Sequence, residues 1–363
     1  MWKFNNPVNI LFGEGSLSTL GQQLNNRRYA VVTYDNAHFA AIATEIKAQC
    51  PGCVTVFNQV AENPDLADLE AICAAFKPHQ NEIEVLVALG GGSVIDTTKA
   101  LAVAKDDHRV IANVLKQHAP VENPLPMIVI PTTTGTGSEV TSWATIWDKD
   151  SGCKYSLNDS ALFPEAAICD PTLTLELPVS LTIQTGLDAL SHAMESIWNR
   201  NANPISLMYA TEAIALIRET LPKLVNEPSN LDLREKMMKG SLLAGLAFSN
   251  TKTSIAHNMS YAVTLETGLP HGIACSFTLP AVLCSFAFSE CPTAQSLRQL
   301  FGDDINAAAK ELESWIHKLN VHTSPEHYGY NKEKWQQIVT DALDGERGKN
   351  FPGCSQQLLN QFI

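Results

Sequence analysis

The sequence predicts two domains of different class: an α/β domain built on a parallel sheet over residues 1–177, and an all-α domain over residues 178–363. Three observations predict this division. Strand-like and helix-like runs alternate through the first half of the chain, which is typical of a doubly wound α/β structure. The runs IEVLVALG (83–90) and PMIVIPTT (126–133) are continuously apolar, as are strands buried on both faces of a parallel sheet. Beyond Pro178 almost no β-rich run remains.

The elements of the first domain follow from a switch between two hydrophobic periods. Short β-rich runs such as YAVVTYD predict strands, whereas longer runs such as AHFAAIATEIKAQ carry apolar residues at helical spacing. We therefore expect strands at 29–35, 54–60, 83–90 and 126–133, and helices at 37–49, 65–76 and 94–104.

The second domain shows helical spacing almost throughout, with Pro and Gly at the ends of the periodic runs. The decapeptide HTSPEHYGYN (322–331) predicts a loop, and we expect only a few short helices between residues 320 and 363. The predicted helices lie in SLTIQTGLDALSHAMESIWNR, PISLMYATEAIALIRETLP, LREKMMKGSLLAGLAF, TSIAHNMSYAV and the region after Gly272.

Composition excludes several classes of partner. The net charge of −13 argues against a nucleic-acid surface or an anionic membrane as partner. No apolar run approaches the roughly 20 residues that a membrane span needs, and the N-terminus lacks the pattern of a secretory signal. The nine cysteines are scattered along a long chain, which is typical of reduced thiols in a cytoplasmic protein. We expect a cytoplasmic protein that acts on a small molecule.

Two loops predict a phosphate-binding site at the carboxyl end of the sheet. The strand IEVLVAL runs directly into three glycines, Gly90 to Gly92, and Ser93 opens the next helix. Strand, glycine turn and helix N-terminus together suit a dinucleotide pyrophosphate, although a plain tight turn would explain one of the glycines. A second loop, PTTTGTGSEVT (131–141), follows the next buried strand and offers hydroxyls and glycines at the same edge. The α/β domain is therefore predicted to bind a dinucleotide.

An acid and three histidines in apolar surroundings predict a metal site in the helical domain. Asp188 and His192 lie four residues apart in GLDALSHAMES, so they share one helix face, and His257 and His271 follow in similar surroundings. One carboxylate and three imidazoles suit Fe(II), Zn(II) or a related divalent ion, with room left for water or substrate. The alternative is an Asp–His hydrogen bond between helices and two unrelated core histidines.

Several segments in combination resemble the iron-containing alcohol dehydrogenases, the group III enzymes. Their order and spacing both match, and the resemblance runs from FNNPVNILFGEG to GERGKNFPG, nearly the whole chain. It implies an N-terminal α/β dinucleotide-binding domain, a C-terminal helical metal-binding domain and an active site in the cleft between them. The matching segments are GGGSVIDTTKA, IPTTTGTGSEVT, GLDALSHAMES, NPISLMYATEAI and the pair AHNMS and LPHGIA.

The resemblance also implies roles for individual residues, since each of these positions falls on a family motif. The four metal ligands would be Asp188, His192, His257 and His271, which would also be catalytic through the metal. The cofactor-binding residues would be Asn63, Gly91, Gly92, Ser93, Asp96, Thr132, Thr133, Thr136 and Lys154.

Two positions depart from the family pattern. Many members have a further His, proposed to move protons, four residues after the third ligand; here that position is Tyr261. Members that prefer NAD often carry an Asp directly after the first strand, whereas Tyr34 stands here and Asp35 follows. Both NAD and NADP therefore remain candidate cofactors.

The predicted reaction is reversible hydride transfer between NAD(P)(H) and a primary alcohol or aldehyde, assisted by Fe(II) or another divalent metal such as Zn. A homodimer is expected, because dimers are common in the family. The stretch MESIWNRNANPIS resembles phosphonoacetaldehyde reductase-like members, so an anionic aldehyde clamped by Arg200 is the specific alternative to a small aliphatic alcohol. Predicted substrate-pocket residues are Trp198, Arg200, Asn203 and Tyr261.

Two other functional classes compete with this prediction. Dehydroquinate synthase, a lyase that uses NAD only transiently, has a related architecture; net consumption of NAD(P)H with an aldehyde would exclude it. A non-catalytic metal or nucleotide sensor would bind nicotinamide without turning over any substrate.

Overall fold

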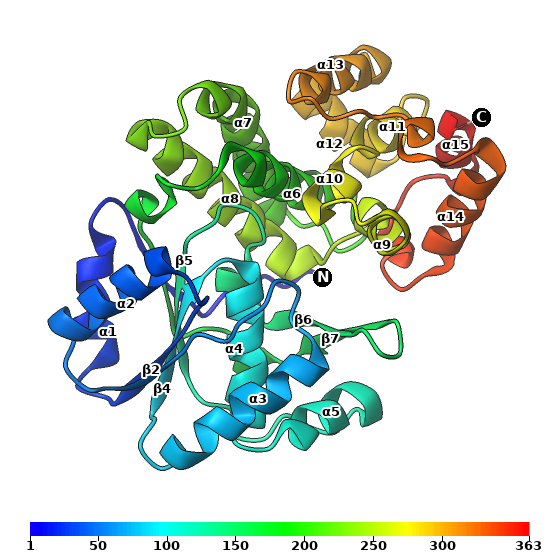
Figure 1. Ribbon diagram of the computed structural model, residues 1–363. Coiled ribbons are helices and arrows are strands. Elements are labelled where there is room, and N and C mark those ends of the chain that lie inside the picture. The colour runs from blue at the N-terminus through cyan, green and yellow to red at the C-terminus, as the bar shows by residue number, and fades with distance from the viewer. Residues whose placement is uncertain (363) are drawn as a thin grey trace. The chain divides into compact units, whose positions relative to one another are not determined.

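The computed structural model describes residues 1–362, and the chain forms two compact units (Figure 1). One unit spans Asn6–Glu176, and the other combines Met1–Asn5 with the chain from Leu177 onward. The first five residues, which the sequence prediction placed in the α/β domain, thus group with the helical unit. Their contacts explain this: the backbone N–H of Asn5 donates to Asn250 Oδ1 at 2.8 Å, and the Phe4 and Tyr209 ring centroids lie 5.8 Å apart.

The α/β unit is built on a six-stranded sheet with the order β1-β8-β5-β4-β2-β3, in which all pairs are parallel. The four expected strands are present. They are β5, β4, β2 and β3, which lie next to one another in the sheet. The predicted doubly wound fold is therefore confirmed. The strands are β1 (Asn9–Phe12), β2 (Tyr29–Val32), β3 (Cys53–Phe57), β4 (Val85–Gly90), β5 (Met127–Pro131) and β8 (Ala166–Cys169).

Alternate residues of β2 show how the sheet is covered on both faces. Ala30 and Val32 pack in one core with α3 and α4, whereas Tyr29 and Val31 pack in a second core with α1 and α2. Figure 1 shows these helix pairs on opposite faces of the sheet. The helices of this unit are α1 (Leu20–Leu24), α2 (Ala37–Gln49), α3 (Leu66–Phe76), α4 (Gly92–Ala104) and α5 (His108–Gln117).

The sequence reading missed three parts of this unit. The strands β1 and β8, of four residues each, were not predicted. An antiparallel hairpin of β6 (Trp143–Asp148) and β7 (Cys153–Asn158) forms a separate two-stranded sheet. The helix α5 also escaped notice, although its N-cap Asp107 accepts a hydrogen bond from the backbone N–H of Arg109.

The second unit is all helical, as predicted, and is built around one large apolar core. Between residues 320 and 362 the chain is more ordered than expected, because α14 reaches thirteen residues and buries Trp335, Ile338 and Val339. The helices are α6 (Val179–Ile197), α7 (Pro204–Asn226), α8 (Leu231–Thr251), α9 (Ile255–Thr267), α10 (His271–Ser276), α11 (Leu279–Cys284), α12 (Pro292–Phe301), α13 (Ile305–His317), α14 (Lys332–Asp344) and α15 (Ser355–Leu359).

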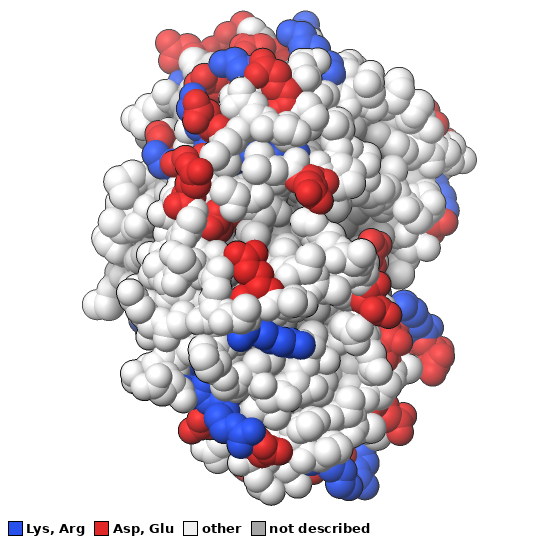
Figure 2. Space-filling view, turned by 60° about the vertical axis from the view of Figure 1, so that its left-hand side comes forward, with Lys and Arg blue, Asp and Glu red and all other residues white. Residues whose placement is uncertain are grey.

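The surface agrees with the composition. On the face shown in Figure 2, basic and acidic side chains are interspersed, and no broad basic area forms. Among residues 1–362, none of the helices combines the length and apolar character that a bilayer crossing demands.

Candidate functional site

Helix α6 carries the acid and the first histidine of the predicted metal site on one buried face. Asp188 and His192 are both nearly inaccessible to solvent, and His192 Nε2 lies 3.9 Å from Asp188 Oδ1. The His192 ring stacks on Phe248 of α8, with centroids 4.0 Å apart and planes 7° from parallel. Helical spacing thus places the two groups side by side, and an aromatic ring holds the imidazole in its orientation.

Two further helices bring the other histidines to the same carboxylate oxygen. His257 of α9 and His271 of α10 place their Nε2 atoms 3.5 Å and 3.9 Å from Asp188 Oδ1. The approach of α10 depends on Gly272, because a Cβ there would lie 1.9 Å from the backbone oxygen of Gln184 on α6. Three imidazoles from separate segments therefore surround one oxygen. The His271 side chain, 40% exposed, leaves this site open on one side.

Glu195, also on α6, holds His257 in place. Its carboxylate accepts hydrogen bonds from the backbone N–H groups of Ser254 (2.9 Å), Ala256 (2.6 Å) and His257 (3.1 Å). Its Oε2 lies 2.7 Å from His257 Nδ1, so it fixes this nitrogen as the proton donor and leaves Nε2 as an acceptor. Burial alone would raise the pKa of Glu195, but His257 and these backbone donors hold it below its usual value.

The buried atoms at the centre of the site fit a divalent cation. Asp188 Oδ1 and His257 Nε2 are fully buried and face each other without forming a hydrogen bond. Two facing acceptors in a buried place are costly unless a cation lies between them. Burial would raise the pKa of Asp188, yet the three histidines hold it below its usual range. Without a metal, Cys275, Glu195 and Asp188 raise the pKa of His257 well above its usual value against the effect of burial, so a proton on Nε2 takes the place of the cation. The surroundings thus favour positive charge at this point.

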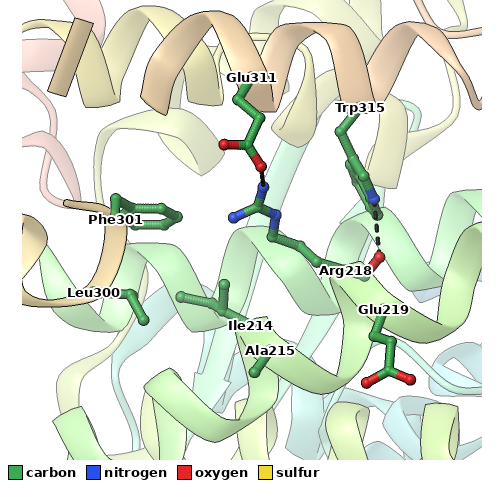
Figure 3. Close-up of a pocket in the computed structure, with 8 residues that line it drawn as sticks. All are labelled: Ile214, Ala215, Arg218, Glu219, Leu300, Phe301, Glu311 and Trp315. Atoms are coloured by element: carbon green, nitrogen blue, oxygen red, sulfur yellow. Dashed lines mark hydrogen bonds and ion pairs between the residues drawn. The ribbon is translucent and has the colours of Figure 1, made fainter. Parts of the chain in front are cut away.

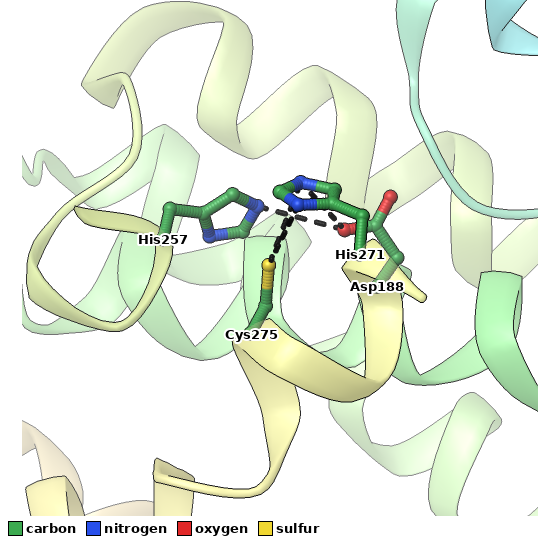
Figure 4. Close-up of side chains that lie close together, drawn as sticks. All are labelled: Asp188, His257, His271 and Cys275. Atoms are coloured by element: carbon green, nitrogen blue, oxygen red, sulfur yellow. Dashed lines mark hydrogen bonds and ion pairs between the residues drawn. The ribbon is translucent and has the colours of Figure 1, made fainter. Parts of the chain in front are cut away.

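A thiol completes the cluster. The donor atoms of Asp188, His257, His271 and Cys275 all lie within 4.8 Å of one another, a tight group that includes Cys275 and not His192. Cys275 Sγ is 3.5 Å from His271 Nε2, and Figure 4 shows the thiol directed toward the His271 ring. Burial raises the pKa of Cys275, although His257 opposes this.

Sequence reasoning missed Glu195 and Cys275, although spacing carried a signal for both. Glu195 follows Asp188 by seven residues and His192 by three, and Cys275 follows His271 by four, so each shares a helix face with a predicted ligand.

The two predicted cofactor loops lie against each other in the α/β unit. A Cβ at Gly91 would lie 3.0 Å from the Thr133 side chain, and one at Gly92 would lie 2.6 Å from Thr136. The first loop therefore needs glycines so that the second can approach it. The backbone N–H of Thr132 donates to Gly90 O at 3.1 Å, which joins the loops at their base.

Three further cofactor candidates, Asn63, Asp96 and Lys154, each make a different contact within the α/β unit. Asn63 has a left-handed backbone (φ 55°), and its N–H donates to Ser93 Oγ at 3.2 Å, so it belongs to the glycine loop. Asp96 is occupied within the protein, because its oxygens accept from Ser138 Oγ (3.0 Å) and from the backbone N–H of Thr145 (2.8 Å). Lys154, on β7, places its ammonium 5.4 Å from the centroid of the Trp147 ring.

Only one of the predicted substrate-pocket residues lies beside the metal cluster. The Tyr261 ring is parallel to that of His271, with centroids 6.2 Å apart. In contrast, Trp198 has no exposed area and stacks on Phe286 in the helical core, so it is a packing residue. Asn203 is the buried N-cap of α7, and Arg200 is an exposed residue between α6 and α7. Helical periodicity ends at Ile197, so the direction of the side chains beyond it could not be predicted from spacing.

A separate pocket of about 450 Å³ lies between α7, α12 and α13 (Figure 3). Its charged groups are already paired, since Arg218 contacts Glu311 at 2.6 Å and the Trp315 indole N–H donates to Arg218 O at 2.9 Å. None of the predicted site residues is among those that line it.

Comparison with known proteins identifies the family of the chain. Two family models match: "Iron-containing alcohol dehydrogenase" over residues 7–171, and "Fe-containing alcohol dehydrogenase family, C-terminal" over residues 182–361. A probable alcohol dehydrogenase, EutG, from Salmonella typhimurium is 32% identical, with 94% of this chain and 89% of the relative covered. The NAD-dependent methanol dehydrogenase of Bacillus methanolicus is 30% identical, with 95% of this chain and 94% of the relative covered.

Solved structures are similar along the full chain. The sulfoacetaldehyde reductase of Bifidobacterium kashiwanohense, in complex with NAD⁺, has a TM-score of 0.91 and 29% identity, covering 100% of this chain and 98% of that one. A 1,3-propanediol oxidoreductase has a TM-score of 0.83 and 26% identity, covering 100% and 99%. Together the two family models span most of the chain in the predicted order, which confirms the resemblance read from the motifs. The chain belongs to the iron-containing alcohol dehydrogenase family.

Proposed function

We propose that this chain transfers hydride between NAD(P)(H) and a primary alcohol or aldehyde, with Asp188, His192, His257 and His271 holding a divalent metal. One observation carries the ligand assignment. Asp188 Oδ1 and His257 Nε2 are buried acceptors 3.5 Å apart without a hydrogen-bond partner, and the His192 and His271 Nε2 atoms lie 3.9 Å from the same oxygen. Oxygen and imidazole donors of this kind suit Fe(II) and Zn(II) alike.

The metal, when bound, would act as a Lewis acid toward the oxygen of the substrate and stabilise alkoxide character there. The protein contributes the geometry. Asp188 supplies the negative charge, and Glu195 presents the lone pair of His257 by holding its Nδ1–H. Gly272 lets α10 approach α6 and so places His271 on the open side of the site. The substrate would enter beside His271.

The two loops of the α/β unit would bind the cofactor. Gly91, Gly92 and Ser93 stand at the N-terminus of α4, where free backbone N–H groups and the helix dipole favour a pyrophosphate. Thr132, Thr133 and Thr136 would add hydroxyls from the adjoining loop, with Asn63 and Lys154 nearby. NAD is supported by the likeness to an NAD-dependent methanol dehydrogenase and to a sulfoacetaldehyde reductase solved with NAD⁺, whereas Tyr34 in place of the family Asp leaves NADP as the alternative. Asp96 would act by holding the second loop through Ser138.

For the substrate we propose a short aldehyde with an anionic group, reduced to the matching alcohol. The support is the likeness to a sulfoacetaldehyde reductase along the whole chain, together with the phosphonoacetaldehyde reductase-like stretch after α6. A neutral short alcohol is the second candidate, favoured by the likeness to methanol dehydrogenase and 1,3-propanediol oxidoreductase. The homodimer and the cytoplasmic location stay predictions.

The test combines metal analysis with a panel of aldehydes. Purified protein should contain a divalent metal and consume NADH or NADPH with at least one aldehyde, which also separates it from a synthase-like lyase and from a sensor. Asp188→Ala should lose the metal and lower kcat/KM by at least about 10³-fold, because the charge that neutralises the cation is gone. Asp232→Ala, at an exposed position on α8, is the matched control and should keep both. Full activity of Asp188→Ala without bound metal would contradict the proposal.

A further inference from the structure

The segment after α14 is clamped to the helix that carries His257 and Tyr261. A Cβ at Gly348 would lie 1.9 Å from Ala342 O, so this chain segment packs directly on the end of α14. Asn258 of α9 donates through Nδ2 to the same Ala342 O at 2.6 Å, and Asn350 donates to Thr253 O at 2.9 Å. Arg347, between these anchors, immediately precedes the 3₁₀ turn Gly348–Asn350. Its backbone is therefore fixed relative to the metal cluster.

The side chain of Arg347 extends toward that cluster. Its guanidinium carbon lies 5.0 Å from the centroid of the Tyr261 ring, and Tyr261 in turn lies parallel to His271 at 6.2 Å. A guanidinium over an aromatic face is held in place while its N–H groups stay directed outward. The Tyr261 ring thus lies against both a positive charge and the histidine at the open side of the candidate metal site.

Within residues 1–362, Arg347 has no carboxylate at ion-pair distance and no hydrogen-bond acceptor for its guanidinium. Other half-buried or buried arginines of this unit are matched by the protein. Arg234 donates to Pro228 O, Thr182 Oγ1 and Leu177 O, and Arg218 contacts Glu311. Burial lowers the pKa of Arg347 and Glu195 opposes this, so the group remains a cation. In a chain of net charge −13, a half-buried arginine with no carboxylate at ion-pair distance among the described residues is unusual.

We infer that Arg347 binds the anionic end of the substrate while the aldehyde oxygen lies at the metal cluster. The inference rests on the proposed function. A guanidinium offers two parallel N–H donors that match the oxygens of a carboxylate, sulfonate or phosphonate. Because Arg347 and His271 both lie near the Tyr261 ring, the distance to be spanned is short, and the substrate class is a short aldehyde with a terminal oxyanion. Arg200, the clamp expected from the sequence, is exposed beyond the end of α6 and carries no comparable contact to the cluster.

The experiment measures kcat/KM of the metal-loaded enzyme for sulfoacetaldehyde, phosphonoacetaldehyde and propanal. Arg347→Met should lower kcat/KM for the anionic aldehydes relative to kcat/KM for propanal by about 10- to 100-fold, the range expected for losing a charge-assisted pair. Arg347→Lys should give an intermediate ratio, since it keeps the charge and loses the fork; it also serves if the Met variant fails to fold. Lys349→Met, an exposed cation in the same turn, is the matched control and should keep the wild-type ratio. The two anionic aldehydes distinguish a singly from a doubly charged tail.

Calorimetry with 2-hydroxyethanesulfonate and with ethanol separates this inference from the proposed function. Wild type loaded with metal and NAD should bind the sulfonate more tightly than ethanol, and Arg347→Met should lose that difference. An unchanged ratio in Arg347→Met, or an equal fall in Lys349→Met, overturns the role of Arg347. If wild type turns over propanal without preferring either anion, the inference is wrong while hydride transfer stands. If no aldehyde is turned over but sulfonate binding still depends on Arg347, the anion site stands and the proposed reaction fails.

Discussion

The two units bury charged groups in opposite ways. In the α/β unit, Lys99 is fully buried and donates to Ser138 O (2.8 Å), Trp143 O (2.8 Å) and Thr141 Oγ1 (3.2 Å), with Asp96 and Glu139 as nearby acids. In the helical unit, the buried Asp188 Oδ1 and His257 Nε2 face each other without a hydrogen-bond partner. The first cluster is completed by its own chain, and the second needs a cation.

The difference separates scaffold from site more sharply than burial or pKa does. Both clusters hold strongly shifted groups, and such shifts occur in structural networks as well as in active sites. The helical unit differs because two of its buried atoms, Asp188 Oδ1 and His257 Nε2, have no hydrogen-bond partner within the protein. The comparison therefore predicts that changes in the first cluster alter stability, and that changes in the second alter metal affinity.

The largest expected effect is on stability, from Lys99→Met. Removing the ammonium leaves two backbone carbonyls and the Asp96 carboxylate buried with fewer partners, which should lower the free energy of unfolding by about 3 kcal/mol. Urea denaturation followed by circular dichroism measures this. Lys116→Met, which removes a half-exposed partner of Asp148, should lower the free energy of unfolding far less, because solvent screens this pair. Equal effects of the two variants would contradict a scaffold role for the buried cluster.

The next effect is on metal affinity, from Glu195→Gln. An amide would direct its NH₂ either at the N–H groups of Ala256 and His257 or at Ser254 N–H and His257 Nδ1, so His257 would lose its fixed orientation. Metal affinity should fall by about 10- to 100-fold, as for other residues that orient a ligand. Competition with a chelator measures the dissociation constant directly.

Activity at saturating metal gives the second readout for Glu195, a positioning residue. There kcat should recover most of its wild-type value, because the ligands themselves are unchanged. Glu219→Gln, an exposed acid paired with Lys223 on α7, should leave the affinity as in wild type. If Glu195→Gln binds metal as tightly as wild type, His257 does not depend on this carboxylate.

The parts of the molecule that were predictable from sequence are those with a long-range pattern. Periodicity predicted α2 with its observed bounds and the two central strands, because buried strands read as apolar runs. Spacing of four residues placed Asp188 and His192 on one face. The same rule, extended to seven residues, would have added Glu195.

Tertiary contacts decided the rest. Arg347 lies more than 80 residues from Tyr261 in the chain, and only the packing of Gly348 on α14 and of Asn258 on Ala342 brings them together. Trp198 is the opposite case. Its position just after a ligand-bearing helix predicted a pocket wall, but its side chain is buried in the core of the helical unit. Sequence distance from a site is thus a poor guide once the helix has ended.

The smallest effect is a pH dependence confined to the α/β unit. Burial raises the pKa of Glu139 from about 4.5 to about 7, although Lys99 opposes the shift. Between these values the folded state binds more protons than the unfolded state, so the free energy of unfolding falls as pH rises. The contribution of Glu139 is fully present below about pH 4.5 and is lost as pH passes through about 7.

Glu139→Gln isolates this contribution, because a glutamine stays neutral at every pH. Relative to the variant, wild type should lose about 1–2 kcal/mol of stability between pH 5.5 and pH 7, measured by urea denaturation at several pH values. If the two stability curves run parallel, Glu139 is already ionised at about pH 5.5 in the folded state and forms a permanent buried pair with Lys99. Both clusters would then contain ionised acids at neutral pH. The two units would differ only in that Asp188 Oδ1 and His257 Nε2 have no hydrogen-bond partner.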